Sequence, residues 1–283
     1  MQAAEAYQNL IQTLTPSHGE GEAQSIARLL FEDLLDWKKG QRDRPLNDRQ
    51  LQLFEAAKQR LLAGEPLQYI TERADFYGLV LKVSPSVLIP RPETEELVEW
   101  VLDQRRDYGN AVSIIDIGTG SGCIPLAIKD NWPQAQVHGL DVSREALAVA
   151  RGNAETLQLD VNWIEQSILD ENRWTDLPSM DIIISNPPYI PYQEADLMPD
   201  SVKEHEPSLA LFIEDEDPLL FYRRIMELAL VKLKSNGLLF FECNEFNAQD
   251  VHRLGEQLGF QDTELRKDLQ GKWRMWKGRR AAS

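Results

Sequence analysis

The residues best suited to chemistry are Asn186, Pro187, Pro188 and Tyr189, which directly follow the apolar run 181–185. Such a run predicts a buried strand, and two prolines end it abruptly because proline fixes φ and lacks a backbone N–H. The Asn186 side-chain oxygen and the Pro187 carbonyl can each accept one N–H from a planar –NH2 group, and the Tyr189 ring can cover that group. We therefore predict that these residues bind an amide or an exocyclic amine and orient its nitrogen for reaction. The alternative is an ordinary strand-terminating turn.

A glycine turn lies earlier in the chain, between a buried apolar run and a predicted helix. Glycines allow a tight turn and the close approach of a ligand, and the free N–H groups of the following helix attract anionic groups. The spacing is G-x-G-x-G, which differs from the G-x-G-x-x-G of dinucleotide-binding folds. The residues predicted to bind a ligand here are Asp116, Gly118, Thr119, Gly120, Ser121 and Gly122.

Asp141 ends the next predicted strand, where its carboxylate can accept hydrogen bonds from two ribose hydroxyls. With the glycine turn, this acid favours a nucleoside that carries a short zwitterionic tail. We predict S-adenosylmethionine as the cofactor and S-adenosylhomocysteine as its product. Leu169 is expected to flank the adenine, and Asn186 to contact the cofactor as well as the substrate. The alternatives are a plain βα turn for the glycines and a turn-capping acid for Asp116.

The elements that must position these residues follow from hydrophobic periodicity. Strand-like runs alternate with helical patterns, which predicts an α/β fold with a mostly parallel sheet covered by helices on both faces. Ligands bind such sheets at the carboxyl ends of the strands. We expect strands at 112–117, 136–140, 162–164, 180–185 and 238–242, and helices at 124–129, 144–157, 218–233 and 248–258.

The part of the chain ahead of this alternation has a different pattern. Its apolar residues recur at the i, i+3, i+4 spacing of helices, of which the first is expected to end before Pro16 and a later one to be capped by Asn47. Short apolar runs then predict a β-hairpin, with a further strand-like run at Val87–Ile89. We divide the chain into a helical domain (1–72), a hairpin linker (73–92) and an α/β domain (93–283) that carries the predicted cofactor and substrate residues; the resemblance described below implies that the helical domain binds the substrate.

Composition limits the partners. The 283 residues include 30 Lys and Arg against 46 Asp and Glu, a formal net charge of −16. A phosphate-binding surface needs clustered basic side chains, so the charge argues against nucleic acid and favours a basic protein partner. The two cysteines, Cys123 and Cys243, lack metal-ligand spacing, and the run Glu214–Asp217 is expected to be a solvated acidic loop, so we predict no metal.

No targeting feature stands out. No apolar run approaches the ~20 residues that a membrane span needs, and the N-terminus lacks the basic-then-apolar pattern of a secretion signal. We expect a cytoplasmic protein without membrane contact, and a monomer is the default.

The two motifs resemble those of the HemK/PrmC-type release factor glutamine methyltransferases, a class I family that uses S-adenosylmethionine. The likeness covers roughly residues 64–280 and includes several further segments. These are Gly64–Ile70, Phe76–Gly78, Val87–Glu95, His205–Pro207, Leu209–Leu211, Phe221–Ile225 and Asp268–Gly271.

The resemblance implies a Rossmann-like domain with a mostly parallel seven-stranded sheet, preceded by a small helical domain and a hairpin that help to bind the partner. The family methylates the side-chain nitrogen (N5) of the glutamine in the Gly-Gly-Gln motif of peptide chain release factors. Carried over by position, Gly118–Gly122 would hold the methionine end of the cofactor, Asp141 the ribose, and Asn186–Tyr189 the glutamine amide. The chain departs from the family at Gln166–Asp170, which leaves the adenine contacts open, and at Asn244.

The main alternative is a methyltransferase that acts on an exocyclic amine of DNA or RNA, because such an amine presents the same planar group. That function needs a basic, aromatic-lined channel, and the chain has only a short basic cluster near its C-terminus (267–280). A nicotinamide-dependent oxidoreductase is disfavoured by the glycine spacing. A non-catalytic adaptor is disfavoured by the intact glycine turn and Asn-Pro-Pro-Tyr corner.

Overall fold

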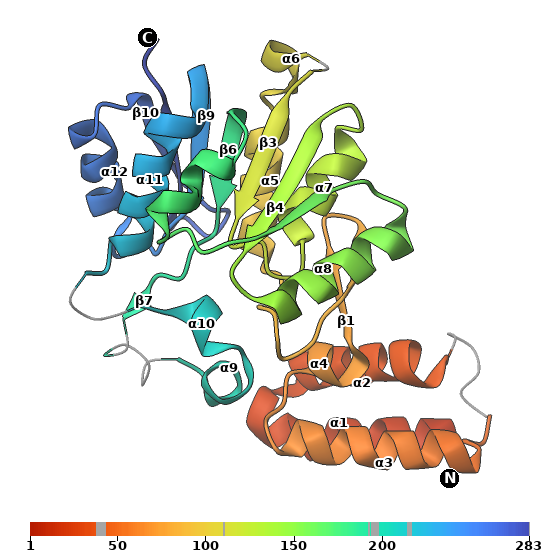
Figure 1. Cartoon of the computed structure of the whole chain (residues 1–283). Helices are drawn as coiled ribbons and strands as arrows, with labels where there is room; N and C mark the ends of the chain where they lie inside the picture. Colours follow the sequence, from red (N-terminus) through yellow and green to blue (C-terminus); the bar gives the residue numbers. More distant parts are fainter. Residues whose placement is uncertain (38–43, 110, 192, 194–197, 214–216, 283) are drawn as a thin grey trace. The chain divides into compact units, whose positions relative to one another are not determined.

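The computed structural model describes the whole chain except residues 38–43, 110, 192, 194–197, 214–216 and 283 (Figure 1). The expected acidic loop therefore lies largely outside the described residues. The chain forms two compact units, which are Met1–Arg73 with Pro199–His205, and Ala74–Met198 with Glu206–Ser283. In the described ranges, each helix is too short or too polar to span a membrane.

The first unit is helical. Its helices are α1 (Ala3–His18), α2 (Glu20–Leu35), α3 (Asp48–Leu62), α4 (Leu67–Thr71) and α9 (Asp200–His205). The first four share one apolar core, in which the buried Phe31 ring packs edge-on against Phe54. Asn47 caps α3 as predicted, because its side chain accepts the N–H of Gln50 at 2.8 Å.

The prediction that the first helix ends before Pro16 is wrong, since α1 continues to His18. A proline in the last turn removes only one helical hydrogen bond. The helix then ends at Gly19, whose N–H bonds the Thr15 carbonyl at 2.9 Å.

A hairpin of β1 (Arg73–Phe76) and β2 (Leu79–Lys82) follows. Its turn residues Tyr77 and Gly78 both have positive φ, 47° and 80°, as tight hairpin turns require. The predicted strand at Val87–Ile89 is absent from the described structure. The Ile89 N–H instead donates to the Glu206 carboxylate at 3.3 Å and is therefore not available to a neighbouring strand.

One mixed sheet organises the second unit, and over the described residues it has seven strands in the order β10-β11-β9-β6-β3-β4-β5. The strands are β3 (Ser113–Ile117), β4 (Gln136–Asp141), β5 (Asn162–Glu165), β6 (Met180–Ser185), β9 (Leu233–Glu242), β10 (Gln261–Lys267) and β11 (Trp273–Arg279). Strands β5, β4, β3, β6 and β9 pair in parallel, and β11 and β10 add an antiparallel edge. The predicted α/β fold, with a mostly parallel seven-stranded sheet after a helical region, is confirmed.

Helices cover both faces of this sheet (Figure 1). Ile114 and Ile182 belong to the core on one face, and the next residues, Ile115 and Ile183, belong to the core on the other. Neighbouring residues of a strand point to opposite faces, so burial on both sides explains the continuous apolar runs. The helices are α5 (Pro92–Leu102), α7 (Cys123–Asn131) and α8 (Arg144–Leu157) on the first face, and α11 (Leu220–Lys232) and α12 (Ala248–Gln257) on the second. Shorter elements are α6 (Arg105–Tyr108), the 3-10 helix η1 (Glu171–Asp176), β7 (Ile190–Pro191), α10 (Ser208–Leu211) and β8 (Phe212–Ile213).

The Trp163 ring of β5 fills a slot beside the glycine turn, and this slot exists because Gly122 and Gly139 have no side chains. A Cβ added to Gly139 would come within 2.5 Å of the Trp163 ring, and one added to Gly122 within 2.9 Å. The φ of Gly139 lies outside the left-handed region, so the space alone requires a glycine there. The slot therefore fixes how closely β4 and β5 pack against the turn.

We predict that Gly139→Ala lowers the free energy of unfolding by about 1–3 kcal/mol, the usual cost of overpacking a core. Gly152→Ala in α8 is the matched control, because its Cβ would meet no atom within 4 Å. The control should raise stability by about 0.5–1 kcal/mol, since alanine favours helices over glycine. Urea denaturation measures both changes, and equal effects of the two substitutions would argue against the slot.

Candidate functional site

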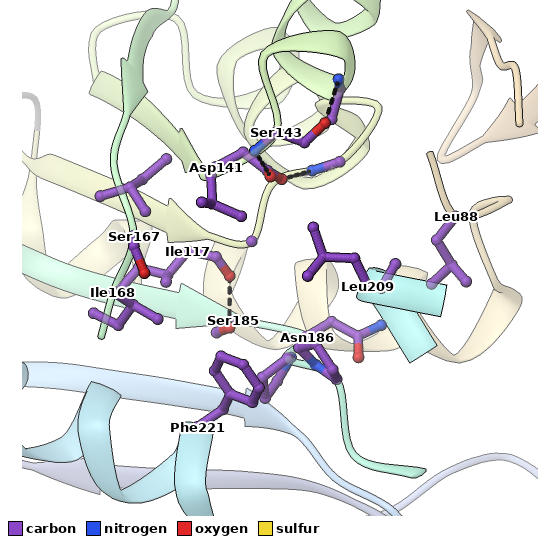
Figure 2. A pocket seen from close by; sticks show the side chains of 18 of the residues that line it. Leu88, Ile117, Asp141, Ser143, Ser167, Ile168, Ser185, Asn186, Leu209 and Phe221 are labelled. Carbon is purple, nitrogen blue, oxygen red and sulfur yellow. Dashed lines mark hydrogen bonds between the residues drawn. The ribbon is translucent and has the colours of Figure 1, made fainter. Parts of the chain in front are cut away.

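A cavity of about 420 Å³ opens at the carboxyl ends of β3, β4 and β6 in the second unit (Figure 2). This is the edge at which parallel α/β sheets bind ligands. Its lining comes from the strand ends and from the loops and helices around them. The lining residues are Ser86, Val87, Leu88, Ile117, Gly118, Gly120, Leu140, Asp141, Val142, Ser143, Glu145, Ala146, Gln166, Ser167, Ile168, Leu169, Ser185, Asn186, Pro187, Pro188, Pro207, Leu209, Ala210, Phe221 and Ile225.

Asp141 ties the glycine turn to the end of β4. Its Oδ2 accepts the Gly120 N–H at 2.8 Å, and its Oδ1 accepts the Ser143 N–H at 2.9 Å (Figure 2). Burial raises the pKa of Asp141 above its ordinary value, although the backbone N–H groups around it oppose the rise. Each carboxylate oxygen keeps a second lone pair, so Asp141 can also accept hydrogen bonds from a ligand in the cavity.

The glycine turn lines the cavity with bare backbone. Gly118 and Gly120 have φ values of 77° and 53°, in the left-handed region that disfavours side chains. A Cβ on either would meet no atom within 4 Å, so the space beside both is open and a ligand can reach the main chain. Gly122 does not line the cavity and instead makes room for Trp163.

Asp116 is an unsatisfied acid behind this turn. It is 1% exposed at the end of β3, and none of the described residues forms a hydrogen bond with its carboxylate. Burial raises the pKa of Asp116 to about 7; the nearby Thr119 hydroxyl opposes the rise, and the Asp141 charge adds to it. Thr119 and Ser121 also have buried hydroxyls without a partner among the described residues. Such groups are costly to bury, and strongly shifted acids are common at functional sites.

The Asn-Pro-Pro corner forms another wall of the cavity. Ser185, the last residue of β6, donates its hydroxyl to the Ile117 carbonyl at 2.6 Å and ties the two strand ends together (Figure 2). Asn186 and both prolines then line the cavity. Tyr189 lies outside the lining, packed against the core of the second face, and burial holds the pKa of its hydroxyl above the ordinary value.

The structure brings together part of the predicted site. The cavity lining includes Gly118, Gly120, Asp141 and Leu169 from the predicted cofactor residues, and Asn186–Pro188 from the predicted substrate clamp. The predicted residues outside the lining are Asp116, Thr119, Ser121, Gly122 and Tyr189. Their roles as ligand contacts stay predictions.

The motifs did not point to the apolar wall of the cavity. Leu88 precedes α5, Leu209 belongs to α10 and Phe221 to α11, and all three line the cavity (Figure 2). Leu209 is 61% exposed, so the cavity is open to solvent on this side. These residues belong to ordinary apolar patterns, and only the fold shows that they surround one space.

A partly buried ion pair fixes this wall. The Arg91 guanidinium bonds Glu206 Oε1 at 2.5 Å, and the same carboxylate accepts the Ile89 N–H. Glu206 is 5% exposed, so removal of the Arg91 guanidinium would leave its buried carboxylate without a compensating charge. The pair joins segments 115 residues apart, which no local spacing could indicate.

Gln166 is a further residue that sequence reasoning did not assign to the site. Its side chain is 3% exposed and lines the cavity. Neither its amide nitrogen nor its amide oxygen has a hydrogen-bond partner in the described part of the chain. Buried amides are nearly always satisfied, so this group is suited to a polar ligand in the cavity.

We predict that Asp116→Asn stabilises the protein in a pH-dependent way. The pKa of about 7 in the folded protein lies above the ordinary value of 3.8, so the folded state holds the proton more tightly than the unfolded chain. Its contribution to stability is therefore complete below pH ~4 and is lost as the pH rises through about 7. The neutral asparagine escapes this loss.

Urea denaturation between pH 4 and pH 8 measures the effect. The variant should match the wild type near pH 4 and exceed its free energy of unfolding by on the order of a few kcal/mol at pH 8. Asp160→Asn gives the effect of removing an exposed carboxylate. A difference for Asp116→Asn that does not change with pH would contradict the assigned burial.

Comparisons with known proteins agree with this architecture. A family model described as "Methyltransferase small domain" matches residues 94–202, and one described as "PrmC N-terminal domain" matches residues 5–71. A crystal structure of a methyltransferase from Pyrococcus furiosus, 18% identical, covers 80% of this chain and 99% of its own with a TM-score of 0.53. That likeness concerns the fold alone.

Two curated relatives are more similar in sequence. The release factor glutamine methyltransferase of Flavobacterium psychrophilum is 40% identical over 273 residues, which cover 94% of this chain and 95% of that protein. The release factor glutamine methyltransferase of Bacteroides thetaiotaomicron is 45% identical over 216 residues, 76% of each chain. On this evidence the chain belongs to the family of release factor glutamine methyltransferases.

Proposed function

We propose that this protein transfers a methyl group from S-adenosylmethionine to the side-chain amide nitrogen of the glutamine in the Gly-Gly-Gln motif of peptide chain release factors. One observation carries the proposal: Asp141, suited to a ribose, and Asn186, suited to an amide, line a single cavity. Membership in the family supports it, because the relatives carry this activity in their names.

The residues of the cavity fit the proposed cofactor. Gly118 and Gly120 leave open space beside their backbones for the methionine end, and Asp141 has lone pairs available for the ribose hydroxyls. At the other side, the unpaired Gln166 amide and the apolar Leu169 suit a nucleobase, which has both polar edges and flat faces. S-adenosylmethionine supplies a methyl group on a positively charged sulfur, which is electrophilic without further activation.

The chain's own task is then to orient the substrate amide. The Asn186 side-chain oxygen and the Pro187 carbonyl would each accept one N–H of the glutamine –NH2 group. Holding the nitrogen close to the methyl carbon replaces an encounter in solution, and fixed dipoles stabilise the positive charge that develops on the amide. A C–N bond forms, the C–S bond breaks, and one amide proton leaves to solvent.

We further propose that the helical residues 1–72 bind the release factor and that residues 93–283, after a hairpin linker at 73–92, carry the reaction. The compact unit of Met1–Arg73 with Pro199–His205, which has an apolar core of its own, supports a separate role for the helical part. The net charge of −16 favours a basic protein surface over free DNA or RNA as the partner. We also propose that the protein acts in the cytoplasm, where peptide chain release factors work, and as a monomer.

Asn186→Ala separates orientation of the substrate from binding of the cofactor. We predict a fall in kcat on the order of 10²-fold or more, because the reacting nitrogen is no longer held in place. The Kd for S-adenosylmethionine, measured by calorimetric titration, should change little. Equal losses in kcat and cofactor affinity would contradict the role of Asn186.

Asp141→Ala is the reciprocal variant. We predict that the Kd for S-adenosylmethionine rises on the order of 10–100-fold, the usual effect of losing hydrogen bonds to a charged group. Glu165→Ala is the matched control, because Glu165 lies opposite Asp141 on the neighbouring strand but does not line the cavity. A comparable loss in both variants would show a general charge effect.

A further inference from the structure

Three side chains from distant parts of the second unit form a hydrogen-bonded series that ends at the Asn186 amide. Asn186 Nδ2 donates to Thr94 Oγ1 at 3.3 Å, and Thr94 Oγ1 donates to Glu242 Oε2 at 2.6 Å. Thr94 lies in the first turn of α5, and Glu242 is the last residue of β9. Thr94 is 3% exposed and Glu242 is 2% exposed, so both hydrogen-bonding groups are shielded from water.

The series has a direction, because a threonine hydroxyl carries a single proton. Thr94 gives that proton to the Glu242 carboxylate and therefore presents a lone pair to Asn186. Only the –NH2 end of the Asn186 amide can bond to a lone pair, since the oxygen end would meet it with repulsion. The amide is thereby fixed in one of its two orientations, which leaves its oxygen for a donor.

The orientation matters for the proposed reaction. The Asn186 side chain lines the cavity (Figure 2), and a substrate –NH2 group offers only donors at its nitrogen. The oxygen of Asn186 can accept one of them. A flipped amide would set donor against donor and leave both unpaired, which costs more than the loss of an ordinary hydrogen bond.

We infer that Thr94 and Glu242 are positioning residues, which hold the Asn186 amide with its oxygen available to the substrate amide. The inference rests on the proposed function, because it concerns the orientation of the proposed substrate clamp. Neither residue has to touch the substrate or the cofactor, and both act through Asn186.

The surroundings of Glu242 fit this role. Burial raises the pKa of Glu242 to about 7, while the Thr94 hydroxyl and the Arg274 and Arg91 charges favour its ionised form. The Tyr222 hydroxyl donates to the Glu242 backbone carbonyl at 3.2 Å and holds the end of β9 in place. Burying a carboxylate is unfavourable in free energy, and the charge-assisted hydrogen bond from Thr94 offsets part of that cost. The test is therefore run at pH 8, where this carboxylate is ionised.

A double-mutant cycle between Thr94 and Asn186 tests the inference. The variants are Thr94→Val, which keeps the shape but removes the hydroxyl, Asn186→Ala, and the two combined. We expect Thr94→Val to lower kcat on the order of 10-fold on a release factor, with little change in the Kd for S-adenosylmethionine. In the Asn186→Ala background the same substitution should change kcat less than about two-fold, because the residue through which it acts is gone.

Three further variants sharpen the cycle. Thr94→Ser keeps a hydroxyl and should restore most of the kcat. Glu242→Leu removes the acceptor of the Thr94 proton, so that proton is free to turn towards Asn186 and kcat should fall at least as far as in Thr94→Val. Ser113→Ala removes a buried hydroxyl that bonds Met180 at the opposite end of the sheet, and it controls for general loss of core packing. Thermal unfolding of each variant identifies any that fail to fold.

Equal losses from Thr94→Val in the two backgrounds, or wild-type kcat in Glu242→Leu, would overturn the inference. An inactive wild type would count against the proposed function instead. In that case NMR of the Asn186 side-chain amide protons, assigned by their loss in Asn186→Ala, tests the inference without substrate. Thr94→Val should shift these resonances and Ser113→Ala should not, and unchanged resonances in Thr94→Val would overturn it.

Discussion

The site depends on the parallel pairing of β3 with its two neighbours. Ile117, the last residue of β3, lies opposite Leu140 of β4 and Ser185 of β6. The residues that follow, among them Asp141 and Asn186, therefore leave the sheet at the same level and meet around one cavity. Because side chains alternate along a strand, a slip of one residue in either register would exchange the two faces. Burial of both faces makes such a slip very costly, and so the register fixes the site.

Several buried polar groups near these strand ends are poorly compensated. The Asp116 carboxylate and the Gln166 amide have no partners among the described residues, and burial raises the pKa of both Asp116 and Glu242 to about 7. Burying such groups is unfavourable in free energy, and the stability of the rest of the fold must offset that local cost. Here the support is the apolar core on each face of the sheet, and of these groups the unpaired Gln166 amide lines the cavity.

The sequence predicted what depends on neighbouring residues and missed what depends on distant ones. The bounds of α8 and β6 match the prediction, because α8 carries an apolar stripe at helical spacing and β6 a continuous apolar run. The strand expected at Val87–Ile89 does not form, because the Ile89 N–H donates to the Glu206 carboxylate and not to a neighbouring strand. The glycine turn and the Asn-Pro-Pro corner carry their chemistry in consecutive residues and could be found. The role of Thr94 could not be found in this way, since its partner Glu242 lies 148 residues away. The lack of a partner for the Gln166 amide is likewise visible only in the folded chain.

The most direct test of the account is mass spectrometry of a purified release factor after incubation with this protein and S-adenosylmethionine. The peptide that contains Gly-Gly-Gln should gain one methyl group. A release factor in which that glutamine is replaced should gain none, and neither should duplex DNA or single-stranded RNA assayed alongside. Methyl transfer to nucleic acid, with none to the Gly-Gly-Gln peptide, would contradict the account and favour an exocyclic amine as the substrate of the same clamp.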